Sequence, residues 1–219
     1  MEIIYQYMIS KADYLVVIPF FNEEYSLKNL QKDLLFIKEN LIFINDNSID
    51  NGPNYLKNYR VINNNKNIGY EKSLLRGLIY AKNNNYKYVI TFDADNQHRI
   101  SDLKKMINLL KEEYDLIIGY RNYFNRYIEY LINYYFYKKF KIKDILSGLK
   151  AYRLELLDLD NNIYSTNSTG IRFSLNLLKN KNYKFYQFKI FVRKRNGKST
   201  FGGMIKGNYT LLKSLISTL

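Results

Sequence analysis

The 219-residue chain contains no cysteine and no tryptophan, and it has only one histidine and two prolines. Without cysteine there can be no disulfide scaffold, no thiolate metal site and no cysteine nucleophile. A single histidine also excludes a zinc site built from several histidines. The hydrophobic share of 47% and the charged share of 25% are ordinary for a folded domain. The composition therefore favours one globular domain that works without thiol or multi-histidine chemistry.

Acidic residues are scarce in the second half of the chain. Residues 1–110 hold 14 Lys or Arg and 12 Asp or Glu, whereas residues 111–219 hold 20 and 8. Most of the net charge of +14 therefore belongs to the second half. A genome of low GC content favours lysine codons and would explain the abundance of lysine. It does not explain why more of the acidic residues lie in the first half. This surplus favours contact with phosphates, nucleic acid or an acidic membrane surface.

Long apolar runs are also missing. The most apolar stretch, residues 14–21 (YLVVIPFF), is interrupted by Pro19 and falls far short of the ~20 residues of a membrane-spanning helix. The first residues lack the basic segment and long apolar run of a signal peptide. We therefore expect a cytoplasmic protein, peripheral on the cytosolic face of a membrane if it binds one.

Short apolar segments alternate with helical patterns over the first 120 residues. The expected strands cover 15–19, 41–44, 59–62, 88–92 and 116–119, and the expected helices cover 24–38, 69–83 and 100–113. This alternation predicts an α/β fold with a mostly parallel sheet and helices on both faces. The C-terminal part adds amphipathic and basic elements, with helical spacing in 122–143 and 171–178, a strand at 186–192 and a basic loop at 193–203. We expect a single domain over residues 1–219.

Polar residues follow the predicted strands, at the edge where open α/β sheets bind ligands. Asp93 and Asp95 form a D-x-D pair that can hold Mg²⁺ or Mn²⁺ together with phosphate oxygens, or can simply cap the next helix. Asp46 either accepts hydrogen bonds from a base or ribose, or forms an Asx turn. Residues 67–69 (NIG) open a helix whose N-terminus suits a phosphate. The glycine spacings of the dinucleotide fold and of the P-loop are absent.

Seven motifs are more specific together than alone. In chain order they are VVIPFFNEE, INDNSID, NIGYEKSLLRG, FDADNQH, IGYR, DILSGLKAY and RKRNGKS. They resemble the family of dolichyl-phosphate mannosyltransferase and related polyprenyl-phosphate glycosyltransferases, over about residues 15–199. The resemblance implies an inverting, metal-dependent enzyme of the GT-A (Rossmann-like) fold. Its donor half would cover about residues 1–120 and its acceptor half about 121–219.

The resemblance also implies roles for individual residues. Those implied in binding the donor nucleotide are Pro19, Asn22, Glu23, Asp46, Asn67, Gly69, Asp93 and Ala94. The metal and diphosphate site would be Asp93, Asp95 and Gln97, with Mg²⁺ or Mn²⁺ as cofactor. The acceptor phosphate would meet Arg121, Ser147, Lys194, Arg195 and Lys198. Asp95, Arg121 and Ser147 are the implied catalytic residues. Lys150 departs from the family, which usually has Arg at this position.

The predicted reaction moves a hexose from a UDP- or GDP-sugar to a polyprenyl or dolichyl phosphate at a membrane surface. A phosphate oxygen is already ionised near pH 7, so the reaction needs little help from a base. The alternative is a soluble GT-A glycosyltransferase with a glycan or other hydroxyl acceptor. That reaction needs a general base, and Asp144 is the candidate. Neither the sugar nor the choice between UDP and GDP follows from the sequence.

The same composition and segments also suit other partners. The aromatic and basic segment 122–143 suits an anionic membrane surface, but also a helix packed on the sheet with lysines reaching to solvent. The net charge and many aromatics suit nucleic acid, whereas the ordered carboxylates at strand ends argue against it. An inactive GT-A scaffold, a membrane-anchoring partner and a homo-oligomer stay open.

Overall fold

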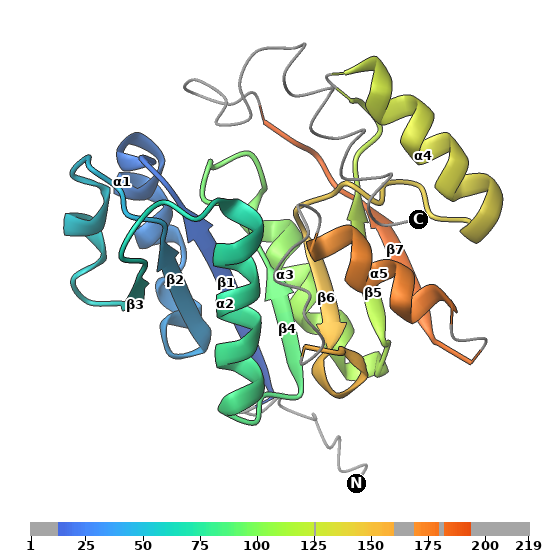
Figure 1. Ribbon diagram of the computed structural model, residues 1–219, viewed down its shortest axis with the longest axis horizontal. Helices are drawn as coiled ribbons and strands as arrows, with labels where there is room; N and C mark the ends of the chain where they lie inside the picture. Colours follow the sequence, from blue (N-terminus) through green and yellow to red (C-terminus); the bar gives the residue numbers. More distant parts are fainter. Residues whose placement is uncertain (1–12, 125, 160–168, 180–181, 194–219) are drawn as a thin grey trace, which may run out of the picture.

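The computed structural model describes residues 13–124, 126–159, 169–179 and 182–193 (Figure 1). Its seven-stranded sheet has the order β3-β2-β1-β4-β6-β5-β7. The strands are β1 (Tyr14–Phe20), β2 (Leu41–Asn45), β3 (Arg60–Asn63), β4 (Tyr88–Thr91), β5 (Leu116–Tyr120), β6 (Lys150–Arg153) and β7 (Phe185–Lys189). The α-helices are α1 (Glu24–Asp33), α2 (Tyr70–Asn83), α3 (Ile100–Leu109), α4 (Tyr127–Phe140) and α5 (Thr169–Lys179). Short 3₁₀ helices are η1 (Leu35–Asn40), η2 (Gly52–Leu56), η3 (Leu110–Glu112) and η4 (Leu154–Leu156).

The strand order creates a switch point between β1 and β4. β1 pairs in parallel with β2 on one side and with β4 on the other. The chain runs outward from β1 to β3 and then returns across the sheet to β4. Crevices at such a point, outside the carboxyl ends of the strands, are where open α/β sheets bind ligands. These ends meet at the upper edge of the sheet in Figure 1.

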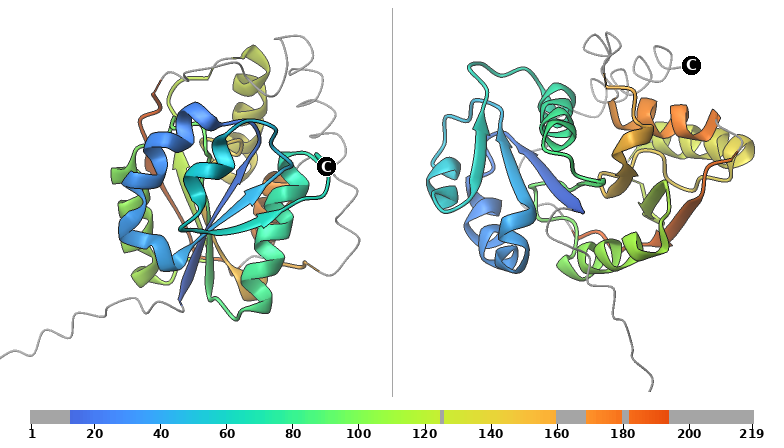
Figure 2. Two further views of the ribbon diagram at one scale, coloured as in Figure 1. Left: turned by 90° about the vertical axis from the view of Figure 1, so that its left-hand side faces the viewer. Right: turned by 90° about the horizontal axis from the view of Figure 1, so that it is seen from below.

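Helices cover both faces of the sheet (Figure 2). On one face Val17 belongs to a buried cluster that includes Leu78 of α2 and Phe173 of α5. On the other face Ile18 of the same strand belongs to a buried cluster that includes Leu30 of α1. A strand buried on both faces reads as an unbroken apolar run, as β1 does. The predicted α/β fold with helices on both faces is confirmed.

Strand β6 is the element that the sequence did not predict. Its sequence KAYR is short, half of it is charged, and it carries no alternating pattern. It forms because it lies between β4 and β5 and pairs antiparallel with both. Running against its neighbours, it places its first residue, Lys150, beside Thr91 and Ile118, close to the ligand edge. Several predicted segments were also too long, since α1 ends at Asp33, α3 ends at Leu109 and β7 ends at Lys189.

Helix α4 lies beyond the carboxyl end of β5 (Figure 1) and forms the predicted helical part of segment 122–143. Its inner face buries Glu129, Asn133 and Phe136, while Tyr127 and Leu131 are exposed. In the described part of the chain, no helix has the length and apolar content needed to cross a bilayer. This helix therefore combines a buried face carrying polar groups with an aromatic outer face.

Candidate active site

The loops after β1 and β2 are held together by hydrogen bonds. The backbone N–H of Asn22 donates to Ser48 Oγ over 3.0 Å, and the N–H of Ile49 donates to Asn22 Oδ1 over 2.9 Å. Asn22 has a φ of 53°, in the left-handed region that asparagine tolerates better than most residues. Asn22 was predicted to bind nucleotide, but its side chain here links the two loops.

Other residues predicted for the donor nucleotide are also used inside the protein. Pro19 and Ala94 are buried, so a ligand at this edge would reach their backbone rather than their side chains. The Glu23 carboxylate accepts a hydrogen bond from the Ser26 hydroxyl at the start of α1. Asn67 is exposed in the loop before α2. The structure thus brings these residues to the predicted edge but makes most of them part of its framework.

Asp46 fixes the entry to α2. Its carboxylate accepts hydrogen bonds of 2.8 Å each from Asn64 Nδ2 and from the backbone N–H groups of Ile68 and Gly69. The N–H groups that we expected to face a phosphate are therefore bound by Asp46. The Asx turn in this loop is made by Asp50, whose Oδ1 accepts the N–H of Gly52. Gly69 has a φ of 90° and a ψ of 158°, a conformation that favours glycine.

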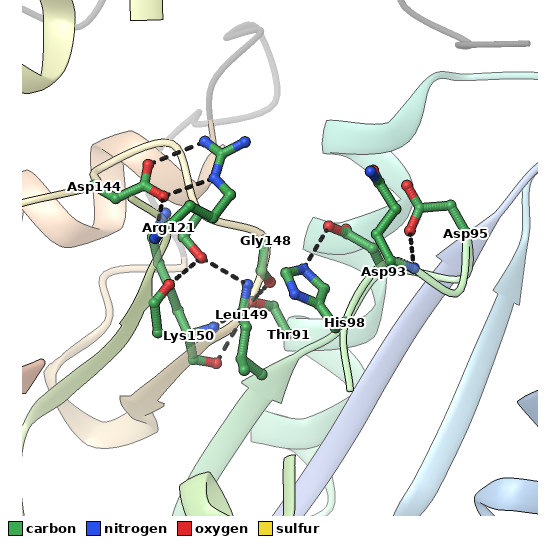
Figure 3. Close-up of polar contacts among 12 residues, drawn as sticks. Thr91, Asp93, Asp95, His98, Arg121, Asp144, Gly148, Leu149 and Lys150 are labelled. Carbon is green, nitrogen blue, oxygen red and sulfur yellow. Dashed lines mark hydrogen bonds and ion pairs between the residues drawn. The ribbon is translucent and has the colours of Figure 1, made fainter. Parts of the chain in front are cut away.

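Asp93 is clamped from several sides. The Tyr70 hydroxyl donates to Oδ1 over 2.7 Å. The His98 ring N–H donates from Nε2 to Oδ2 over 3.2 Å, as Figure 3 shows. Burial by itself would raise the pKa of Asp93, but the hydrogen bonds from His98 and Tyr70 outweigh it and lower the pKa. Gly148 presses against the same carboxylate, because a Cβ on Gly148 would lie 1.8 Å from Asp93 Oδ2. Asp93 is therefore held ionised in one orientation.

Tyr70 joins the two acidic loops. The N–H of Gly69 binds Asp46, and the hydroxyl of the next residue binds Asp93. Asp46 and Asp93 therefore lie on either side of the first turn of α2, as the convergence of strand ends predicted. The sequence indicated no role for Tyr70 or Gly148. The available signals were the position of Tyr70 directly after the NIG turn and of Gly148 within the SG pair.

Asp95 and Gln97 complete the loop after β4. The N–H of Gln97 donates to Asp95 Oδ1 over 3.0 Å. Gln97 also exchanges hydrogen bonds with the backbone of Arg193, through its side-chain Nε2 over 3.2 Å and its carbonyl over 2.9 Å. The chain after β7 is thus attached to the D-x-D loop. Lys194, Arg195 and Lys198, predicted to bind phosphate, lie outside the described residues.

The donor set suits a hard divalent cation that is shared with a substrate. Within the described ranges, no group of three or more His, Cys, Asp or Glu residues is placed to hold a metal ion. A carboxylate offers about four lone-pair sites, so the hydrogen bonds at Asp93 and Asp95 leave room for a metal. Mg²⁺ characteristically takes one or two carboxylates and completes its shell with phosphate oxygens and water. These two aspartates fit that pattern.

Arg121 is bound by two carboxylates. Its Nε and Nη2 lie 2.7 and 3.1 Å from the two oxygens of Asp144, which is fully buried. Glu129 of α4 approaches Nη2 to 3.3 Å. Burial would lower the pKa of Arg121, but the attraction of Asp144 outweighs it and raises the pKa above its ordinary value. Arg121 is therefore a permanent cation whose direction is set by Asp144, and Glu129 is a partner that the sequence did not indicate.

This geometry changes two predicted roles. The Asp144 carboxylate accepts from the Arg121 side chain, from the Arg121 N–H and from Asn133, so it positions Arg121 and does not reach an acceptor as a base. Ser147 is buried, donates its hydroxyl hydrogen to the Gly119 carbonyl and accepts from the N–H of Leu149. Ser147 therefore ties the loop to β5, and its hydroxyl is not aimed at the predicted acceptor phosphate.

Lys150 is a buried amine at the same edge. Its side chain is almost inaccessible, and Nζ donates to the Ile145 carbonyl over 2.7 Å. Burial lowers the pKa of Lys150 from its ordinary 10.5 to about 8, although Asp144 and Glu71 oppose the shift. The ammonium form is kept at a cost of about 3 kcal/mol at neutral pH, since a pKa difference of one corresponds to about 1.4 kcal/mol.

A Lys150→Met variant should reveal this cost as a pH dependence of stability. Between pH 8 and 10.5 the unfolded wild type holds a proton that the folded protein has lost, so wild-type stability rises with pH in that window. The wild type should gain about 2–3 kcal/mol relative to Lys150→Met between pH 7 and pH 10. Urea unfolding at both pH values measures this, with exposed Lys189→Met as control. Parallel pH profiles for all the proteins would contradict the account of Lys150.

The fold and the edge of acidic loops at its switch point define a GT-A type α/β protein. The chain belongs to glycosyl transferase family 2, whose model matches residues 15–196. An uncharacterized protein of Methanocaldococcus jannaschii, MJ1222, is 32% identical over 192 residues, covering 74% of this chain and 76% of that protein. A second, MJ0544, is 31% identical over 119 residues, and the match spans 50% of this chain and about half (52%) of that relative.

Solved structures support the same fold. Glucosyl-3-phosphoglycerate synthase from Mycobacterium tuberculosis, in complex with Mn²⁺, UDP and phosphoglyceric acid, has a TM-score of 0.72 at 17% identity. That match covers 94% of this chain and 78% of the other. The complex of the same enzyme with Mn²⁺ and UDP-glucose has a TM-score of 0.70 at 18% identity, covering 94% and 79%. The predicted Mg²⁺ or Mn²⁺ cofactor is consistent with the metal in these neighbours.

Proposed function

We propose that the protein is an inverting glycosyltransferase that moves a hexose from a UDP- or GDP-sugar to a polyprenyl phosphate, with Mg²⁺ or Mn²⁺ as cofactor. The observation that carries the proposal is the continuous contact from Asp46 through Gly69 and Tyr70 to Asp93. It joins the loop after β2, which would bind the nucleoside, to the loop after β4, which would bind the diphosphate. Both loops lie at the switch point of the sheet.

On the donor side, some residues would bind the metal and others position them. Asp93 and Asp95 would hold the metal, which when bound would neutralise charge on the departing nucleoside diphosphate. Tyr70, His98 and Gly148 keep the Asp93 carboxylate in place, so little reorganisation is needed when the donor binds. Mn²⁺ and UDP-sugar in the structural neighbours support this assignment.

The acceptor side supplies a fixed cation. Arg121 stays charged and is aimed by Asp144, so it can orient an ionised phosphate for in-line attack on the anomeric carbon. Attack from the side opposite the leaving group inverts that carbon. The geometry of Asp144 favours this phosphate acceptor over the hydroxyl alternative, because the candidate base is occupied by Arg121. The neighbour's complex with phosphoglyceric acid also supports an acceptor that carries a phosphate.

A membrane surface is the proposed place of the reaction. The outer side of α4 exposes Tyr127, Leu131 and Tyr134, and Lys138 lies 5.5 Å from the Tyr134 ring. Aromatic side chains flanked by lysines suit the boundary between headgroups and acyl chains of an anionic bilayer. The protein would then be peripheral on the cytosolic face.

Transfer assays separate the acceptor classes. Radiolabelled UDP- and GDP-hexoses are incubated with Mn²⁺ and with dolichyl phosphate in anionic vesicles, 3-phosphoglycerate or an oligosaccharide. The proposal expects label in the lipid fraction that increases with vesicle-bound acceptor. Label only in phosphoglycerate would overturn the polyprenyl acceptor, and label only in the oligosaccharide would overturn any phosphate acceptor.

A further inference from the structure

We propose that a groove on α4 beside Arg121 binds the first isoprene units of the acceptor; this inference rests on the proposed function. The groove has a volume of about 440 Å³, within the range of small-molecule sites. Its walls are mostly apolar and aromatic, and they come from α4 and the segments on either side of it. The lining residues are Phe124, Tyr130, Leu131, Asn133, Tyr134, Tyr137 and Lys143.

The groove is continuous with the predicted phosphate site. The ring of Phe124, which lines the groove, lies 5.2 Å from the guanidinium carbon of Arg121. Asn133, at the other wall, donates to Asp144, the residue that aims Arg121. A ligand whose phosphate meets Arg121 can therefore lay the adjoining carbon chain directly along Phe124 and α4. This arrangement fits an amphiphilic anion better than a small phosphorylated acid.

The exposed apolar surface of the groove is what a hydrocarbon chain would cover. Leu131 is 66% exposed and Tyr134 is 62% exposed. Both lie on the same flank of α4, three residues apart, so one extended chain can contact both. Lys143 stands at the rim, with Nζ 3.2 Å from the Tyr120 hydroxyl. The charge at the rim and the apolar walls thus complement a prenyl phosphate along its length.

Binding of prenyl phosphates of increasing length tests the groove without a membrane. Isothermal titration is carried out with isopentenyl, geranyl and farnesyl phosphate, in the presence of Mn²⁺ and the nucleoside diphosphate. The dissociation constant should fall about tenfold for each added isoprene unit that the open groove partly buries. Leu131→Gln should remove most of this gain and weaken the binding of isopentenyl phosphate, the shortest ligand, least. Leu35→Gln changes a leucine of similar exposure in η1, outside the groove, and should behave as wild type.

The outcomes separate the groove from the function on which it rests. Equal affinities for the three phosphates, or an unchanged length dependence in Leu131→Gln, would overturn the groove while leaving a phosphate acceptor in place. Sugar transfer to a hydroxyl acceptor, with no binding of any prenyl phosphate, would overturn both proposals. A length dependence that Leu131→Gln loses and Leu35→Gln keeps would support the groove.

Discussion

A Gly148→Ala variant is expected to lose nearly all transfer activity. Its new Cβ would lie 1.8 Å from Asp93 Oδ2, a separation that real atoms do not adopt. Asp93 would have to leave its hydrogen bonds with Tyr70 and His98, and the carboxylate would move from the metal position. A misplacement of about 1 Å at a reacting site costs roughly 100-fold in rate, so we expect kcat/KM to fall at least to that extent. Steady-state kinetics over a range of Mn²⁺ concentrations measure the loss.

Gly170→Ala is the matched control for this experiment. A Cβ on Gly170 would meet nothing closer than Lys150 Nζ at 3.6 Å, an ordinary contact distance. Alanine is also favoured over glycine within a helix such as α5. This control should keep wild-type activity. Wild-type kcat/KM in a folded Gly148→Ala variant would contradict the role given to the Asp93 clamp.

The second large effect is expected at Asp144. Asp144→Asn removes a fully buried charge from Arg121 and turns an amide donor toward guanidinium donors. Breaking one side of a buried ion pair costs about 3 kcal/mol or more. We expect urea unfolding to record this loss, and kinetics to record a higher acceptor KM with a weakened but measurable kcat.

Asp115→Asn provides the comparison. Asp115 Oδ1 lies 2.9 Å from Arg153 Nε, and this ion pair is not part of the D-x-D loop. This variant should lose some stability while keeping acceptor KM. The two variants together separate lost folding energy from lost positioning of Arg121. An Asp144→Asn protein that folds normally but shows almost no kcat would instead point to a general base, and so to a hydroxyl acceptor.

The donor half was readable from the sequence because its signals are local. Apolar runs such as Leu15–Ile18 indicate buried strands. The acidic D-x-D loop directly follows another such run, which forms β4. The order of strands and helices then brings Asp46 and Asp93 to one edge of the sheet. Hydrophobic periodicity and the alternation of strands and helices, both of which are local in the chain, therefore predicted the fold class and the edge at which these carboxylates lie.

The acceptor half was less predictable because its contacts are distant in sequence. β6 is a strand only because β4 and β5 pair with it on both sides. Asp144 would be a candidate general base if its carboxylate were free, but it positions Arg121 when the two are paired. No sequence pattern distinguishes these two roles. Gly148 is needed for its closeness to Asp93, which lies more than fifty residues away. Such residues act through pairs that tertiary structure creates.

The most direct test of the account is calorimetric titration of UDP- and GDP-hexoses, with and without Mn²⁺, into the wild type and Asp95→Ala. We expect one of the two donors to bind in a Mn²⁺-dependent manner. We also expect Asp95→Ala to weaken this binding by roughly 100-fold without changing the unfolding temperature. Binding that needs neither the metal nor Asp95 would contradict a diphosphate site at the D-x-D loop.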